Sequence, residues 1–396
     1  MTKNTFDLSR ARRETPACEH VLHFNNAGAA LMPNPVLDAL VQHLKLEAAI
    51  GGYEAKDREL AAIEHVYEAA AKLINCAPEE IAIVENATRA WDMAFYAIPF
   101  KEGDRILTAK AEYISNYIAY LQISDKTGAR IEIIPDDEHG QTSVEALRKL
   151  IDDRVKLISI THVPTHGGLV NPIVRIGEVA REAGILYLVD ACQSVGQMPI
   201  DVEEIGCHIL STTGRKYLRG PRGIGFLYVQ RNLIEKLNPP FLDMHAARWV
   251  SKDVYEIRND ARRFENWEQY FAGKLALGVA IDYAQQWGIQ ETWGRIRGLA
   301  DLLRRRLTSV GLVVHDTGEQ RCGIVTFSVP GVDSSEVQRK LAEKQINVTV
   351  SLQEYSWPDL GERDVKHMVR ASVHYYNTED EVERFCSMLQ TIGYTA

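Results

Sequence analysis

Seven short apolar segments, which alternate with helix-like segments along the middle of the chain, constrain its fold more than any other feature. Several are near-continuous apolar runs, the pattern of strands that are buried on both faces of a sheet. Helical patterns lie between them at 144–151 and 176–183, and Gly184 is placed to end the second. This alternation predicts an α/β fold with a mostly parallel sheet covered by helices on both faces. The expected strands are 81–84, 105–109, 130–134, 156–160, 186–190, 209–212 and 225–229.

The character of the sequence changes near Phe271. Long helical stretches are followed there by short apolar segments and a last helical pattern, which indicates a smaller α+β unit. A chain of 396 residues is also too long for a single hydrophobic core. We therefore expect an N-terminal segment (1–20), a large domain (21–270) and a small C-terminal domain (271–396). The elements expected after residue 270 are helices at 274–287, 293–310 and 379–392 and strands at 323–329, 346–350 and 369–373.

Composition excludes several classes of protein. The net charge is −9, whereas general affinity for nucleic acid needs clustered lysines and arginines. No apolar run approaches the ~20 residues that cross a bilayer, and residues 1–20 lack the apolar core of a signal peptide. The six cysteines include no Cys-x-x-Cys pair, which argues against a disulfide scaffold and a thiolate metal site. We expect a cytoplasmic protein that binds neither nucleic acid, membrane nor metal.

Polar residues that follow two expected strands are the first candidates for chemistry, because ligands of parallel sheets bind beyond the carboxyl ends of the strands. Asp190 ends an apolar strand, where a carboxylate is costly to bury unless a cation pairs with it. A protonated pyridine nitrogen would be such a partner, and a helix cap is the alternative. Lys216 follows the next strand, where burial and neighbouring cations would lower its pKa as an amine nucleophile requires. A surface lysine is the alternative there.

A phosphate site is indicated by residues near two strand ends. Asn86 and Thr88 open a helical stretch after the strand at 81–84, and a helix N-terminus favours phosphate through its free N–H groups and its dipole. Thr213 and Arg215 can add hydroxyl and guanidinium contacts. An ordinary N-cap by Thr88 is the alternative. Neither a Walker motif nor Gly-x-Gly-x-x-Gly occurs in the sequence.

The order of these motifs resembles the class V aminotransferase superfamily, which has the type I fold of pyridoxal-phosphate (PLP) enzymes. The resemblance runs from Asn25-Asn26-Ala27-Gly28 to the segment 369–378. It implies PLP as the cofactor, held by Lys216 as a Schiff base, with Asp190 at the pyridine nitrogen and Gln193 at the ring hydroxyl. It also implies a large domain with a seven-stranded sheet. By the same resemblance Ala87, Thr88, Thr213 and Arg215 hold the phosphate, Tyr113 stacks on the ring, and Thr165 replaces a cofactor-binding asparagine.

The resemblance also implies an amino-acid substrate. Arg370 stands where the family binds the substrate α-carboxylate, a task that suits a planar guanidinium. Asn26, Ala27 and Gly28 would line the substrate entrance. His166 has no assigned role in the family, and a substrate contact and an ordinary loop residue are the two alternatives for it. Dimeric relatives imply a homodimer. Their segment that reaches the neighbouring subunit's phosphate corresponds to 264–269, which lacks the expected threonine.

Two features of the sequence bear on the reaction. The loop 351–357 contains no cysteine, whereas cysteine desulfurases need a mobile cysteine before the carboxylate-binding arginine, so we expect desulfurase activity to be absent. The segments 51–54 and 215–223 resemble hercynylcysteine sulfoxide lyases. We therefore expect PLP-dependent C–S β-elimination from a cysteine conjugate or its sulfoxide. An aminotransferase or epimerase, which share α-proton removal, and a non-catalytic PLP-binding protein are the alternatives.

Overall fold

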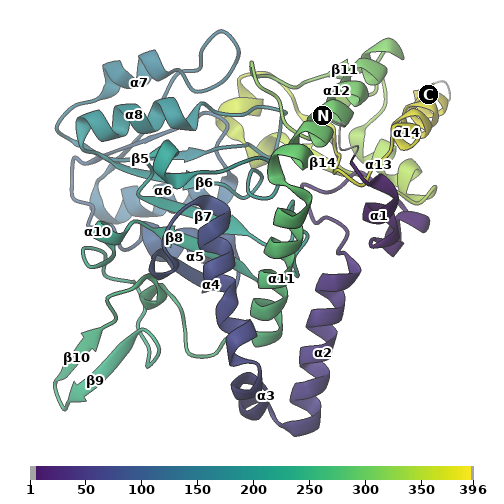
Figure 1. The fold of residues 1–396 in the computed structure, drawn as a ribbon. Coiled ribbons are helices and arrows are strands. Elements are labelled where there is room, and N and C mark those ends of the chain that lie inside the picture. The colour runs from purple at the N-terminus through teal and green to yellow at the C-terminus, as the bar shows by residue number, and fades with distance from the viewer. Residues whose placement is uncertain (1–5, 394–396) are drawn as a thin grey trace, which may run out of the picture.

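A seven-stranded sheet forms the centre of the larger part of the molecule (Figure 1), and it is mostly parallel as predicted. The computed structural model describes residues 6–393. Residues 1–5 of the expected N-terminal segment and residues 394–396 of the expected small C-terminal domain lie outside the described part. All strands run parallel except β8, which is antiparallel to both of its neighbours. In spatial order the strands are β2 (Ile81–Val84), β8 (Gly225–Val229), β7 (Ile209–Thr213), β6 (Leu186–Asp190), β5 (Val155–Thr161), β3 (Arg105–Thr108) and β4 (Arg130–Ile133).

Helices cover both faces of this sheet, because alternate residues of each inner strand point to opposite sides. Ile158 and Val189 belong to one hydrophobic cluster and Leu157 and Leu188 to another. The strands between the sheet edges are almost fully buried, while the edge strand β4 is partly exposed. The helices of this part are α2 (Asn34–Ile50), α3 (Gly52–Arg58), α4 (Leu60–Ile74), α5 (Ala87–Phe95), α6 (Ile114–Thr127), α7 (Val144–Leu150), α8 (Ile173–Ala183), α9 (Val202–Ile205) and α10 (Arg231–Ile234).

A second, antiparallel sheet lies in the C-terminal part of the chain. Its order is β11 (Val313–Val314), β12 (Ile324–Ser328), β15 (His367–Ser372) and β14 (Thr349–Leu352). The helices that follow residue 270 are α11 (Phe271–Trp287), α12 (Ile289–Ser309), α13 (Ser334–Ala342) and α14 (Glu379–Gly393). The change from parallel to antiparallel architecture agrees with the change of sequence pattern near Phe271.

The N-terminal residues pack against this C-terminal part. Strand β1 (Leu22–His23) pairs in parallel with β13 (Ile346–Asn347), and Arg12, in α1 (Leu8–Arg13), lies 2.7 Å from Glu381. Helix α11, in contrast, packs on α2 and α4 of the larger part (Figure 1). The proposed domain limits after residues 20 and 270 therefore stay predictions.

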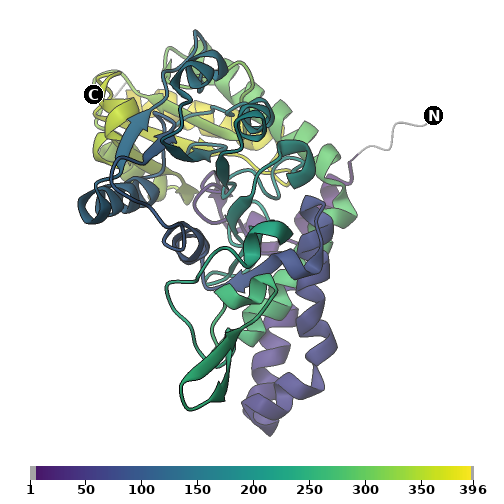
Figure 2. The same ribbon diagram turned by 90° about the vertical axis from the view of Figure 1, so that its left-hand side faces the viewer.

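A hairpin of β9 (Ala247–Ser251) and β10 (Val254–Ile257) projects away from the body of the molecule in both views (Figures 1 and 2). Its strands are largely exposed although they carry apolar side chains such as Trp249 and Tyr255. Among the described helices, none is both long and apolar enough to cross a lipid bilayer.

Candidate active site

The chain order of the large sheet reverses between β3 and β5, which creates a crevice at the carboxyl ends of these strands. From this point β4 lies outward on one side, and β6 and β7 follow on the other. Ligands of open parallel sheets bind at such a reversal. A cavity of about 530 Å³ lies there. The predicted cofactor-binding residues all line it: Ala87, Thr88, Tyr113, Thr165, Asp190, Gln193, Thr213, Arg215 and Lys216.

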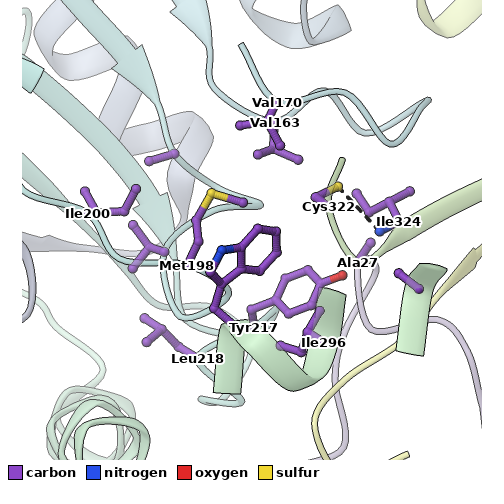
Figure 3. Packing of buried hydrophobic residues seen from close by; sticks show 14 of the residues in the cluster. Ala27, Val163, Val170, Met198, Ile200, Tyr217, Leu218, Ile296, Cys322 and Ile324 are labelled. Atoms are coloured by element: carbon purple, nitrogen blue, oxygen red, sulfur yellow. Dashed lines mark hydrogen bonds between the residues drawn. The ribbon is translucent and has the colours of Figure 1, made fainter. Parts of the chain in front are cut away.

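Lys216 lies in the tight loop between β7 and β8, and the next residues anchor it. Tyr217 and Leu218 are each 1% exposed and pack with Met198 and Ile296 in the hydrophobic core (Figure 3). The Lys216 carbonyl accepts a hydrogen bond from the Arg219 N–H at 2.9 Å. Packing on one side and a cavity on the other therefore direct the amine of Lys216 into the cavity.

Burial lowers the pKa of Lys216, and the nearby cations Arg215 and Arg370 lower it further. Cys192 and Asp190 oppose this shift. An amine with a lowered pKa is more often uncharged, and only the uncharged amine can attack a carbonyl carbon. The structure therefore gives Lys216 the environment of an amine nucleophile, and the alternative of an ordinary surface lysine is wrong.

Asp190 ends β6 and is 5% exposed. Its Oδ1 accepts the Cys192 N–H at 2.9 Å and its Oδ2 accepts the Asn116 amide at 3.0 Å. No helix in the described structure is capped by this carboxylate, so the helix-cap alternative is wrong. Two hydrogen bonds hold the carboxylate at the cavity wall, where a cationic ring nitrogen can pair with it.

The residues predicted to hold phosphate converge from two loops. Ala87 and Thr88 open α5, and the Arg215 guanidinium lies 3.1 Å from Thr213 Oγ1. The alternative role of Thr88 as N-cap is wrong, because Asn86 Oδ1 accepts the Arg89 N–H at 2.9 Å. A helix N-terminus, two hydroxyls and a guanidinium together form a site for a dianion.

Arg370 lies on β15 of the small sheet, and it lines a cavity that Lys216 also lines. Its guanidinium donates to the Thr165 carbonyl at 3.3 Å and to Asn25 Oδ1 at 3.4 Å, and it also donates to Thr165 Oγ1. Burial lowers its pKa to about 10, so it stays cationic at neutral pH. It has no carboxylate partner among the described residues, and its buried Nε is unpaired. A buried cation without a counter-ion favours an anionic ligand.

The structure corrects one of the predicted substrate-binding residues. Ala27 and Gly28 line a second cavity beside Arg370 and Lys216, but Asn26 does not. The Asn26 side chain is fully buried, donates to the Ser372 carbonyl at 2.7 Å and accepts from the Tyr376 hydroxyl. It therefore joins the segment that follows β1 to the small sheet.

Gly28 is needed where it stands, because an added Cβ would lie 2.7 Å from Asn25 Oδ1. That oxygen is the one that accepts from Arg370. Asn25 was not among the predicted site residues, and its position directly before Asn26 was the available signal.

Glu112 and Asn116 were also missed as site residues. The Asn116 amide nitrogen lies 3.0 Å from both Glu112 Oε1 and Asp190 Oδ2, so it joins the two carboxylates. Glu112 accepts further hydrogen bonds from Thr108 Oγ1 at 3.0 Å and the Tyr113 N–H at 2.7 Å, and one from Thr161. Burial, with the nearby Asp190 charge, raises the pKa of Glu112 to about 7. Glu112 is therefore a second buried acid, linked to Asp190 through Asn116.

The raised pKa of Glu112 predicts how the stability of the protein changes with pH. The folded protein keeps a proton on Glu112 that the unfolded chain releases above its ordinary pKa of 4.5, so stability falls as pH rises from about 4.5 to 7. The contribution is on the order of 3 kcal/mol at most. We expect Glu112→Gln to lose less stability than the wild type between pH 5 and pH 8, as measured by the melting temperature. Equal pH dependence of the two proteins would contradict the assigned pKa.

The segment 264–269 is anchored within its own chain. Glu265 is buried, and its carboxylate accepts hydrogen bonds from the Tyr67 hydroxyl at 2.8 Å and the Ile83 N–H at 2.7 Å. Asn266 donates to Glu85 at 2.8 Å. These contacts hold Glu265 and Asn266 against other parts of the same chain.

The cavity fits PLP by the chemistry of its walls. The residues of the dianion site at the start of α5, the carboxylate of Asp190 and Lys216 all line the same cavity. Gln193 donates to the Ala27 carbonyl and Thr165 Oγ1, each at 3.1 Å, which leaves its buried Oε1 without a partner. Phosphate, pyridine nitrogen, aldehyde and ring hydroxyl each have a matching group.

Known proteins resemble this chain over nearly its whole length. The family model "Aminotransferase class-V" matches residues 22–385. A "Probable cysteine desulfurase" from Methanothermobacter thermautotrophicus is 28% identical, over 96% of this chain and 97% of the relative. The apo structure of a cysteine desulfurase from Thermococcus onnurineus has a TM-score of 0.92 at 25% identity and covers 100% of both chains.

A third similarity concerns the cofactor. A lysine-to-alanine variant of the protein C-DES, solved with glycine covalently linked to its PLP cofactor, has a TM-score of 0.87 at 21% identity, over 96% of this chain and 98% of that one. At this identity the likeness shows the shared fold alone.

These similarities correct two expectations about the reaction. The expected β-elimination from a cysteine conjugate or its sulfoxide is wrong, because the similar proteins carry the names of cysteine desulfurases. The expectation that desulfurase activity is absent is contradicted by the same names. Transamination, epimerisation and a non-catalytic role fit them no better.

Proposed function

Because the chain belongs to the class V aminotransferase family, whose cofactor is PLP, we propose that it removes sulfur from cysteine by cleaving the C–S bond. The observation that carries the proposal is that the buried amine of Lys216 and the buried guanidinium of Arg370 line one cavity. An α-amino acid presents an amine and a carboxylate to such a pair. The names of the relatives point to cysteine among the amino acids.

The roles of the residues follow from their positions. When bound, PLP supplies an electron sink that weakens the bonds at the substrate's Cα and Cβ. Arg370 binds the α-carboxylate, and Lys216 binds PLP and moves protons at Cα. Asp190 favours the protonated pyridine nitrogen, and the walls around Thr88 and Thr213 hold the phosphate. Residues from both sheets therefore orient the substrate.

The destination of the sulfur is part of the proposal. Of the six cysteines, Cys192 is the one that lines the cavity, and burial raises its pKa well above the ordinary value. A protonated thiol is a weak nucleophile. We infer that a small thiol from solution accepts the sulfur. Its thiolate attacks Sγ of the substrate, the C–S bond breaks with its electron pair going to Cβ, and Cβ takes a proton. The products are a persulfide and alanine.

Product analysis with L-cysteine tests this proposal. The holoenzyme, given cysteine and an excess of dithiothreitol, should release sulfide and alanine in equal amounts, because a second thiol group reduces the persulfide. Omission of cysteine is the control. Sulfide with pyruvate in place of alanine would contradict the sulfur transfer to a thiol, and no sulfide at all would contradict the function.

We also propose a cytoplasmic homodimer. The hairpin β9–β10 exposes Trp249 by 78% and Tyr255 by 60%, and exposed apolar patches of this kind mark protein interfaces. All six cysteines are free thiols, which is typical of a reducing compartment.

A further inference from the structure

A buried histidine with an unpaired ring nitrogen lies beside the proposed substrate site. His166 is 7% exposed and lines the second cavity, of about 270 Å³, together with Lys216 and Arg370. Its Nδ1 lies 3.0 Å from Ser351 Oγ, while its Nε2 is buried and has no hydrogen-bond partner in the described structure. Leaving such a nitrogen unpaired is unfavourable, which favours a ligand that pairs with it.

Several contacts hold the imidazole in place. Ser351 lies on β14, directly before the segment that carries Tyr355, and the Tyr355 ring lies beside the imidazole at 6.1 Å between centroids and 26° between planes. Burial lowers the pKa of His166 to about 3, and the cations Arg370 and Lys216 lower it further, against the effect of the Tyr355 carbonyl. The ring is therefore neutral at physiological pH.

The position of His166 relative to the two cations indicates what it binds. A substrate whose amine is at Lys216 and whose carboxylate is at Arg370 has one further substituent, its Cβ group. Cavity walls not taken up by those two contacts include His166, Ser351 and Tyr355. Among these three residues, His166 has a buried ring nitrogen without a partner in the described structure, which is available to the Cβ substituent.

We propose, on the basis of the function proposed above, that His166 Nε2 hydrogen-bonds the thiol or hydroxyl on Cβ of the substrate and so selects cysteine-like amino acids. Either tautomer of the neutral ring serves this role. If Ser351 donates to Nδ1, then Nε2 carries the proton and donates; if Nδ1 donates to Ser351, then Nε2 accepts. A thiol or hydroxyl can pair with Nε2 in either tautomer, because each group both donates and accepts hydrogen bonds. A methyl group can do neither.

Binding of two unreactive amino acids to the holoenzyme tests the inference without catalysis. L-Serine places a hydroxyl where cysteine has its thiol, and L-alanine has only a methyl group. Both are titrated against the cofactor absorbance of the wild type, His166→Ala and Ser351→Ala. A matched control is His139→Ala, because His139 is an exposed histidine outside both cavities.

We expect His166→Ala to weaken serine binding by about 5- to 10-fold, the effect of one hydrogen bond, and to change alanine binding less than twofold. Ser351→Ala should weaken serine binding in the same selective way, and His139→Ala should change neither. Equal loss of both ligands, or no loss of serine binding, would overturn the inference. If neither amino acid perturbs the wild-type absorbance, the function proposed above fails with it.

Discussion

Replacing Lys216 by alanine should abolish sulfur release from cysteine, with a loss of about 10³-fold or more in kcat. The variant loses both the amine that binds the cofactor and the group that moves protons at Cα. It should also lose the absorbance band of the lysine-bound cofactor. The absorbance of the purified protein and its rate of sulfide release measure the two effects.

The chain provides a matched control for this variant. Lys274, on α11, is also buried and also has a lowered pKa, chiefly because of burial. Its amine contacts the Tyr67 hydroxyl at 2.5 Å and Gln269 at 2.9 Å, and it does not line the cavity that holds Lys216. Lys274→Met should keep the band. Loss of the absorbance band in Lys274→Met, together with its persistence in Lys216→Ala, would refute Lys216 as the residue that binds the cofactor.

Asp190→Asn should lower kcat/KM for cysteine by about 10²- to 10³-fold, with a melting temperature close to that of the wild type. The amide keeps the size of the side chain and one oxygen, which can still accept from the Cys192 N–H, whereas its NH2 group cannot accept from Asn116. The loss of that one hydrogen bond costs about 1 kcal/mol. The substitution removes the negative charge that favours a protonated pyridine nitrogen, and with it most of the electron-withdrawing power of the ring. Steady-state kinetics at saturating PLP measure the effect.

A matched substitution of the second acid shows whether charge at Asp190 matters in particular. Glu112→Gln changes a carboxylate that reaches the same Asn116 from the other side but does not line the cavity. It should reduce kcat/KM far less than Asp190→Asn does. An Asp190→Asn enzyme within threefold of wild-type activity would contradict the role of the carboxylate.

Most of the fold could be predicted because burial on both faces leaves a strong signal in the sequence. Strands such as Leu186–Asp190 are apolar at nearly every position, and the polar residue that follows each strand is then easily found. Asp190 and Lys216 were chosen as candidates in this way, and both line the cavity. The ends of helices could be predicted in a similar way. Gly184 ends α8, as expected, with a φ of +64°.

The residues that were not predicted, such as Asn116, or whose role was left open, such as His166, act through partners that are distant in sequence. Asn116 touches Asp190, which is 74 positions away, and His166 touches Ser351, which is 185 positions away. Asn26 was assigned to the substrate entrance although its side chain turns toward Ser372, because adjacent residues at this bridge face opposite ways. A sequence pattern shows that such a residue is polar and does not show what it contacts.

The error about the reaction has a different cause. The absence of a cysteine from residues 351–357 was treated as decisive, although that loop is a small part of a chain that resembles desulfurases over nearly its whole length. A missing nucleophile excludes one route for the sulfur. It leaves open a route in which the accepting thiol comes from solution.

Mapping of the covalent attachment tests the central claim, that one buried amine carries the cofactor beside Asp190, most directly. The holoenzyme is reduced with borohydride, digested and analysed by mass spectrometry. The account predicts the mass of a phosphopyridoxyl group on the peptide that contains Lys216. Attachment at Lys274 or another lysine, with Lys216 unmodified, would contradict it.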